Sequence, residues 1–425
     1  MKKIVILFVI TLGLVHAVSA QNVVYAQQII DTLTSNHFHG RGYVNKGDFL
    51  ASRFIAQQFK EIGLQPLQQD DYYHKFKLDV NTFPKEVSIA ANGKKLNTGG
   101  DFIVAPSCPT TQAIGLTVHF VTKEALMNKT TWKQLIRLDW NSNVLLIDTI
   151  KHDKKSQKKL DKLLKKYTNP ISLQVQKKLT WSVARNQAAE TKIFVLPGVL
   201  SGGEKLDITI DAKLIKDYAS QNVIGYLEGS EQPDSFIFVT GHYDHLGRMG
   251  ANCIMPGAND NASGIAMILD LAKHLKASGT RYSVVFIAFA GEEAGLVGSY
   301  HMVSDLRSFV NPAKIRFVVN MDLMGAGQEG IMAVNGSIFT REYALLESIN
   351  EEKSYLPIVK KRGKAANSDH YFFSEAGIPA FFFYLMGPYN HYHDVDDTRE
   401  NLRLEKQAYD GAFHLVRDFI FALSK

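Results

Sequence analysis

Residues able to bind metal ions or transfer protons gather at five places in the second half of the 425-residue chain. They are histidines, aspartates and glutamates, and no cysteine stands among them. In chain order they occur in the segments 241–245 (GHYDH), 257–264 (GANDNASG), 291–293 (GEE), 320–322 (NMD) and 391–393 (HYH). Each residue alone has an ordinary structural explanation, such as an N-cap for an aspartate before a helix. A shared chemistry is the better explanation only if the fold brings the five segments together.

Apolar runs predict the elements that would position these segments. Strands are predicted at 236–240, 283–290, 315–321 and 380–384, and helices at 51–62, 262–275 and 404–423. Continuous apolar strands alternating with helices favour an α/β fold, with a mostly parallel central sheet and helices on both faces. Ligands in such folds bind beyond the carboxyl ends of the strands. Because the five segments follow or lie between these strands, we expect them at one edge of one sheet.

The residue types at that edge indicate a metal site. Carboxylates that gather in one place repel one another unless cations compensate their charge. Imidazole and carboxylate ligands without thiolates suit zinc, and manganese or cobalt are the alternatives.

Glu292 and Glu293 leave the predicted strand as neighbours, and neighbouring residues of a strand point in different directions. One of them can bind a metal while the other faces the water bound to that metal. The metal lowers the pKa of this water, and the second carboxylate can accept its proton and pass it to a leaving amine. The alternative is a pair of surface glutamates in a loop, which the apolar run 286–291 directly before them disfavours.

The ordered motifs resemble metallopeptidase family twenty-eight, which comprises the co-catalytic dizinc aminopeptidases and their relatives. The matching runs cover roughly residues 219–425, and GRG at 40–42 and NVIG at 222–225 also fit. They read GHYDHLG (241–247), GANDNASG (257–264), AGEEAGLVGS (290–299), NMDLMG (320–325), SDH (368–370) and YHDVDDT (392–398). The resemblance implies a zinc aminopeptidase-like fold with two zinc ions per chain.

The resemblance also implies a role for each matched residue. The implied metal ligands are His242, Asp260, Glu293, Asp322 and His393, with Asp260 bridging the two ions. Glu292 matches the general base. Asp244 matches a carboxylate that orients His242, as is usual for a metal-bound histidine.

Three further residues, His391, His245 and Asp369, lie near the matched positions. His393 is preferred to His391 as the ligand, because its spacing to the Asp397-Thr398 pair fits that pattern. His245 and Asp369 are expected to line the pocket.

The first twenty residues predict a secretory signal peptide. Lys2 and Lys3 precede an apolar stretch, and the small residues 18–20 supply a cleavage site before Gln21. The stretch is too short to span a bilayer, and no cysteine at the cut provides for a lipid anchor. We therefore expect a periplasmic or extracellular protein without a membrane anchor.

The remaining chain is predicted to divide into three parts. Residues 21–85 and 219–425 form the peptidase domain, and 86–218 form an inserted accessory domain. The insert lies where many family members carry a protease-associated domain, although here the likeness is faint. The strand-like runs 116–121, 144–147 and 193–196 belong to this insert.

The insert also carries much of the basic charge of a chain whose formal net charge is +6. Its run 151–166 could bind an anionic partner. The simpler interpretation is a solvated helix face with Leu160, Leu163 and Leu164 turned inward. Because no aromatic residues are interleaved with the charges, we expect no nucleic-acid partner. Cys108 and Cys253 could form one disulfide in an oxidising compartment or remain free.

We expect peptide substrates and an aminopeptidase that hydrolyses their N-terminal residues. A carboxypeptidase or dipeptidase is an alternative with the same chemistry. Glutaminyl cyclases resemble the family but generally use one zinc ion. A fourth possibility is a binding protein that keeps the fold without catalysis, and the intact set of ligand positions argues against it. The preferred residue and the oligomeric state are left open.

Overall fold

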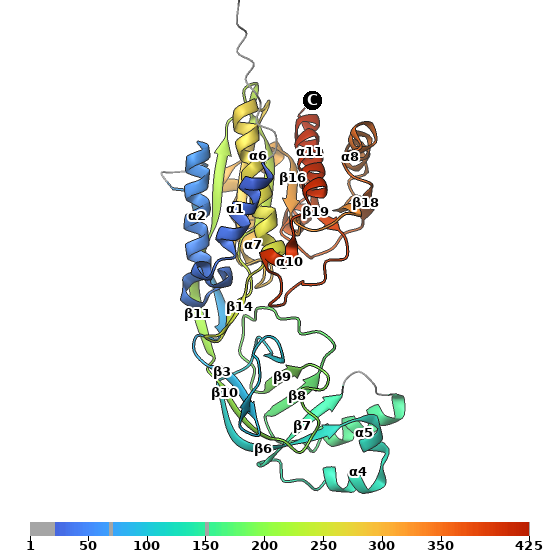
Figure 1. The fold of residues 1–425 in the computed structure, drawn as a ribbon. Coiled ribbons are helices and arrows are strands. Elements are labelled where there is room, and N and C mark those ends of the chain that lie inside the picture. Colours follow the sequence, from blue (N-terminus) through green and yellow to red (C-terminus); the bar gives the residue numbers. More distant parts are fainter. Residues whose placement is uncertain (1–21, 68–70, 149–152, 425) are drawn as a thin grey trace, which may run out of the picture.

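The computed structural model describes residues 22–67, 71–148 and 153–424. The predicted signal peptide lies outside the described residues. Two large β-sheets organise the rest, one in the upper body of Figure 1 and one in the lower body. No helix within the described ranges is both long and apolar enough to cross a membrane.

The main sheet has nine strands and a parallel centre. Its path runs β1 (Gln65–Pro66), β11 (Lys213–Leu227), β15 (Tyr282–Phe289), β12 (Gln232–His242), β16 (Ile315–Met321), β19 (Ala380–Met386), β17 (Gly330–Val334) and β18 (Val359–Arg362), and β2 (Tyr73–Thr82) pairs with β11. Strands β15, β12, β16 and β19 are mutually parallel. The β11–β15 and β17–β19 pairs are antiparallel, so the sheet as a whole is mixed.

Helices cover both faces of this sheet, as the sequence predicted. Along β15, Val284, Phe286 and Ala288 belong to one apolar core, and the intervening Val285, Ile287 and Phe289 belong to another. This alternation follows from the period of two in a strand. The first core includes α1 (Val23–Leu33), α2 (Gly47–Ile62), α6 (Gly264–Ser278) and α11 (Lys406–Leu423). The second includes α7 (Val297–Phe309) and α9 (His370–Glu375).

A second sheet of eight strands lies between residues 87 and 210. Its order is β4 (Lys94–Lys95), β3 (Val87–Ala91), β10 (Lys205–Ile210), β6 (Thr111–Val121), β7 (Asn143–Asp148), β8 (Ile171–Val175), β9 (Thr191–Val195) and β5 (Phe102–Val104). One face packs against α3 (Lys123–Met127), α4 (Lys129–Leu135) and α5 (Lys154–Leu164). The long strand β11 follows this sheet and runs into the main one (Figure 1).

The remaining regular elements lie near the site or at the far edge of the main sheet. They are β13 (Gly247–Met249), β14 (Cys253–Met255), a π-helical turn at Ala258–Ser263, α8 (Thr340–Lys353), α10 (Arg399–Leu402) and 3-10 turns at Asn36–Arg41, Val44–Lys46 and Pro312–Lys314.

Two expectations about the insert and the cysteines have an outcome here. In α5, Leu160 and Leu163 are buried, but Leu164 is 39% exposed, so its predicted inward position is wrong. A helix of 3.6 residues per turn rotates Leu164 about 100° away from Leu163. Cys108 and Cys253 are both buried and free, and the Cys108 thiol donates to the carbonyl of Lys192 instead.

Candidate active site

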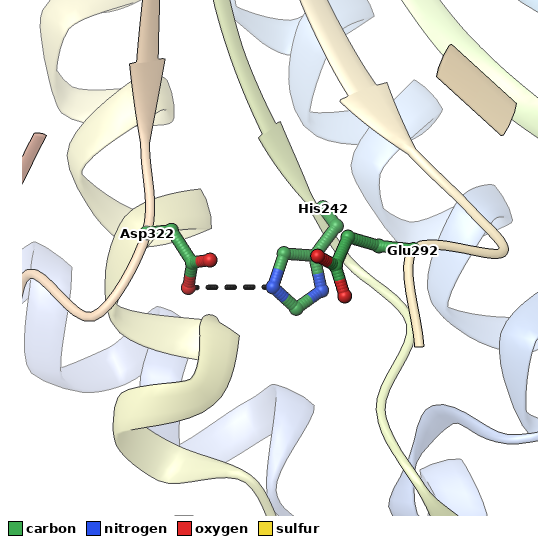
Figure 2. Close-up of side chains that lie close together, drawn as sticks. All are labelled: His242, Glu292 and Asp322. Atoms are coloured by element: carbon green, nitrogen blue, oxygen red, sulfur yellow. Dashed lines mark ion pairs between the residues drawn. The ribbon is translucent and has the colours of Figure 1, made fainter. Parts of the chain in front are cut away.

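Three of the predicted site residues stand at the ends of adjacent parallel strands. His242 is the last residue of β12, Asp322 directly follows β16, and Glu292 follows β15 after a tight turn. Figure 2 shows the carboxyl groups of Asp322 and Glu292 turned toward the His242 ring. A Cβ atom on Gly241 would lie 2.5 Å from the main-chain oxygen of Met321, so glycine permits the two strands to close beside His242.

Asp260 is supplied by the π-helical turn that leads into α6. Its position is set mainly through the backbone. The carboxylate of Asp397 accepts hydrogen bonds from the main-chain N–H groups of Asn259 (2.9 Å) and Asp260 (3.0 Å). The buried guanidinium of Arg41 donates to the carbonyl of Asp260 at 3.2 Å. Tyr389 in turn donates to Asp397 at 2.6 Å.

The Asp260 carboxylate lies between two imidazoles. One of its oxygens, Oδ1, is 3.3 Å from Nε2 of His242, and the other, Oδ2, is 3.1 Å from Nε2 of His393. His242 Nε2 also lies 3.3 Å from Asp322 Oδ1. His393 Nε2 lies 3.2 Å from Glu293 Oε2. The five predicted ligands therefore form two groups that share Asp260.

The other predicted neighbours lie close by, with two differences from expectation. His245 is buried behind Glu293, with its Nδ1 2.8 Å from Oε1, and Asp369 is buried at the start of α9. Neither lines the cavity beside the cluster, so that expectation is wrong. His391 lies 3.6 Å from Asp394. His393 instead contacts the carboxylates of Asp260 and Glu293, as the sequence predicted for the ligand.

Asp244 contacts His242 mainly through its backbone. Its main-chain oxygen lies 3.1 Å from His242 Nδ1, and its carboxylate oxygen lies 3.8 Å away. That carboxylate accepts the N–H of Glu292 at 3.2 Å and faces the hydroxyl of Tyr43 at 3.4 Å. Burial is the main cause that raises the pKa of Asp244 to about 8. The side chain of Asp244 thus holds the glutamate loop, while its main-chain oxygen contacts the histidine.

Electrostatics separate the two neighbouring glutamates. Burial alone would raise the pKa of Glu293, but the charge of His393 and the hydrogen bonds from His245 and His393 hold it at about 2. Burial raises the pKa of Glu292 well above its ordinary value, and the charge of Glu293 adds to the rise while His242 opposes it. At Asp260, burial raises the pKa, but hydrogen bonds from His242 and His393 outweigh it and hold the pKa well below the ordinary range.

The donor atoms of the cluster fit metal binding. Ligand atoms of His242, Glu292 and Asp322 lie within 4.8 Å of one another, as do those of His242, Asp260 and Glu293. Ionised carboxylates buried this closely require compensating positive charge. Nitrogen and oxygen donors without a thiolate are those that zinc, manganese or cobalt accepts.

A cavity of about 230 Å³ opens beside the cluster. Its walls combine cluster residues with aromatic and polar neighbours. They are His242, Asp260, Glu292, Asp322, Leu323, Arg362, Asn367, Phe382, Tyr384, Tyr392 and His393. A substrate group in this space would contact Glu292 and the two groups of ligands at once.

Sequence reasoning missed four residues that position this cluster. Arg41 and Asp397 hold the Asp260 turn, and Ser368 donates to Asp322 Oδ2 at 3.1 Å. The main-chain oxygen of Trp181 lies 3.0 Å from His393 Nδ1. Arg41, Ser368 and Asp397 lie inside the motifs GRG, SDH and YHDVDDT. Their place in these motifs was the signal that could have identified them as partners of the ligands. Trp181 carried no signal, because its contact is made by the backbone.

A cluster of carboxylates and imidazoles at the strand ends of an α/β sheet defines a candidate metal-dependent hydrolase of the zinc-peptidase type. Residues 222–420 match the model described as peptidase family M28. Over these residues, a little under half of its length, the chain matches the family that its motifs resemble.

Comparison with individual proteins agrees with this assignment. The chain is 29% identical over 224 residues to Aminopeptidase YwaD of Bacillus subtilis, a match that covers 49% of the chain and 46% of that relative. A zinc aminopeptidase structure from Bacillus subtilis covers 94% of each chain with a TM-score of 0.68 and 19% identity. A peptidase M28 precursor from Shewanella amazonensis covers 94% of this chain and 93% of its own, with a TM-score of 0.68 and 15% identity. These structures share the fold. The chain matches less than half the length of its curated relative.

Proposed function

We propose that the chain is an exported metallo-aminopeptidase that uses two zinc ions to hydrolyse N-terminal residues from peptides. The observation that carries this proposal is the position of Asp260, whose two carboxylate oxygens face the Nε2 atoms of His242 and His393 at 3.3 and 3.1 Å. A carboxylate placed between two histidines, each accompanied by a further carboxylate, is suited to bridge two cations. The names of the relatives, aminopeptidases and zinc metalloproteases, support the same activity.

The cluster would hold the ions in two groups. His242, Asp260 and Asp322 would bind one ion, and Asp260, Glu293 and His393 would bind the other. When bound, the ions would supply Lewis-acid polarisation of the scissile carbonyl and a water of lowered pKa.

Glu292 is placed to move the proton. Its carboxyl group lies at the cavity wall beside His242 and Asp322 but is absent from the group that contains Asp260. Burial raises its pKa well above that of an ordinary glutamate, which makes it a better base. Glu292 would accept a proton from the attacking water and deliver it to the leaving amine.

The small cavity favours the end of a chain over an internal segment. A space of about 230 Å³ walled by Phe382, Tyr384 and Tyr392 is suited to one or two residues. A carboxypeptidase, a dipeptidase and a glutaminyl cyclase would also bind the end of a chain in a small cavity. Assays with different substrates therefore distinguish them from an aminopeptidase.

Two measurements test the proposal. Metal analysis of the purified protein should find two zinc ions per chain. Hydrolysis should be seen with aminoacyl chromogenic substrates and not with peptides blocked at the amino group. Cleavage of blocked peptides from the carboxyl end, cyclisation of N-terminal glutamine, or no reaction at all would reject the aminopeptidase and favour one of the alternatives.

The proposed export rests on the sequence pattern of residues 1–20. N-terminal sequencing of the protein from fractionated cells should begin at Gln21 and place it outside the cytoplasm. An N-terminus that retains residues 1–20 would contradict the proposed cleavage.

A further inference from the structure

Arg362 lines the wall of the candidate active-site cavity although it lies far from the metal-binding motifs in sequence. It is the last residue of β18, the edge strand of the main sheet. No sequence motif singled it out, and it is a basic side chain in a cavity whose other charged groups are the cluster residues.

The register of the sheet explains how Arg362 reaches the cavity. Arg362 pairs with Val334, Val334 pairs with Phe382, and Phe382 pairs with Asn320. Residues directly opposite in neighbouring strands share a face. Arg362 therefore stands on the same face as Phe382, about 10 Å away across two strand spacings.

Asn320, the last of these paired residues, is connected to the candidate metal ligands. The side chain of Asn320 donates to Ser368 Oγ at 2.8 Å, and Ser368 donates to Asp322 at 3.1 Å. The cavity thus has the carboxylate and imidazole cluster at one end and Arg362 at the other, with Phe382 between them.

Lys361 and Lys364 are engaged elsewhere, whereas Arg362 is not. Lys361 lies over the ring of Tyr343, with its Nζ 4.7 Å from the centroid. Lys364 pairs with Glu375. Across the ranges 22–67, 71–148 and 153–424, Arg362 has neither a carboxylate nor an aromatic partner, and its side chain is exposed. Its charge is therefore available to a ligand.

We propose that Arg362 binds a carboxylate of the peptide substrate and so gives the enzyme a preference for short or acidic peptides. A guanidinium presents a planar fork of donors that matches a carboxylate in bidentate geometry. The carboxylate can be the free C-terminus of a dipeptide or the side chain of an aspartate or glutamate. The proposal rests on the proposed peptidase function and specifies the substrate of the same site.

Matched peptide pairs test it and distinguish the two sources of carboxylate. The dipeptide Leu-Gly is compared with Leu-Gly-amide, and Glu-Leu-amide with Gln-Leu-amide. In the wild-type enzyme, kcat/KM for the charged member of at least one pair should exceed that for the neutral member by about tenfold, the scale of one exposed charge-assisted hydrogen bond. A high ratio in the first pair identifies the C-terminus, and in the second pair the acidic side chain.

Variants then assign the preference to Arg362. Arg362→Gln should reduce that ratio to about one, and Arg362→Lys should retain part of it, because lysine keeps the charge but not the fork. Lys360→Gln is the matched control, since Lys360 lies two residues earlier on the same strand face, is exposed and does not line the cavity. It should leave the ratio as in the wild type. Thermal denaturation of each variant confirms that it is folded.

The outcomes separate the two proposals. If peptides are hydrolysed and both wild-type ratios are near one, or if Arg362→Gln keeps a high ratio, the role of Arg362 is overturned while the peptidase function stands. If no peptide is hydrolysed by zinc-loaded enzyme, both are overturned. A ratio that declines as salt is raised toward 1 M supports the proposal, because salt screens an exposed pair.

Discussion

The Nδ1 atom of His393 lies 3.0 Å from the main-chain oxygen of Trp181, and the main-chain N–H of Trp181 donates to the oxygen of His393 at 2.9 Å. A carbonyl only accepts, so Nδ1 carries a hydrogen toward Trp181, and Nε2 is the ring nitrogen that faces Asp260 and Glu293. Trp181 lies between β8 and β9 of the second sheet. The insert therefore helps to set the orientation of a candidate metal ligand.

Lys178 extends this contact to the loop around His393. Its Nζ donates to the carbonyls of Asn390 and Tyr392 and pairs with Asp394 at 3.1 Å. Lys178→Met should loosen the loop and lower the affinity for the zinc ion that His393 would bind by about tenfold, the usual scale for outer partners of a ligand. Titration of the zinc-loaded protein with a chelator measures this affinity.

Lys177→Met provides the matched control for Lys178. Lys177 is exposed next to Lys178 and makes none of these contacts. Equal zinc retention in the two variants would show that the insert does not support the His393 position.

Glu292→Gln should lower kcat by about 10² to 10⁴-fold, the range for loss of a general base, while zinc content stays at the wild-type value. The amide keeps the shape of the side chain but cannot accept the proton. Turnover and metal content are measured on the same preparation. Activity within a few-fold of wild type would show that another group takes the proton.

Metal stoichiometry should distinguish the shared ligand from the unshared ones. Asp260→Asn should reduce zinc to fewer than one ion per chain, because both groups lose the bridging carboxylate. His393→Ala should retain about one ion, because His242 and Asp322 keep their 3.3 Å approach. His391→Ala is the control and should retain both. If Asp260→Asn and His393→Ala lost the same number of zinc ions, the proposal that Asp260 is shared by two ligand groups would be contradicted.

The parts of the site that could be predicted from the sequence are those produced by a local pattern. The apolar runs 315–321 and 283–290 correspond to β16 and, within a residue, to β15, and the acids after them meet because parallel strands end at one edge. The antiparallel flanks β17 and β18 were not predicted, so Arg362 was not connected with the cavity. The sheet has the parallel centre that was expected, with antiparallel strands at its flanks.

Backbone contacts between distant segments account for most of what was missed. The bond from Arg41 to Asp260 joins residues 219 apart, and that from Trp181 to His393 joins residues 212 apart. A main-chain acceptor leaves no trace in residue type. Asp244 is a further example. The sequence predicted that its carboxylate orients His242, but its main-chain oxygen lies nearer to the His242 ring than its carboxylate does.

Arg41→Lys should lower the free energy of unfolding by about 3 kcal/mol or more, the cost of leaving buried acceptors without donors. The guanidinium is fully buried and donates to five main-chain oxygens. An ammonium has at most three hydrogens for them. Urea denaturation measures the loss, and Arg53→Lys on the exposed side of α2 should have little effect. Equal stability of the two variants would contradict this role of Arg41.

Asp48 should make stability fall as pH rises. Burial is the main cause that raises its pKa to about 6, although Tyr218 and Ser220 donate to it. An aspartate in an unfolded chain has a pKa near 3.9, so the contribution of Asp48 is complete below that value and is lost as pH rises through about 6. From about pH 5 to about pH 8 this loss is about 1 to 2 kcal/mol. Asp48→Asn lacks the titration, so its unfolding free energy relative to wild type should increase by that amount across the interval. Urea denaturation at both pH values tests this, with exposed Asp234→Asn as the control. A relative stability of Asp48→Asn that stays constant with pH would mean that Asp48 is already ionised in the folded protein at the lower pH.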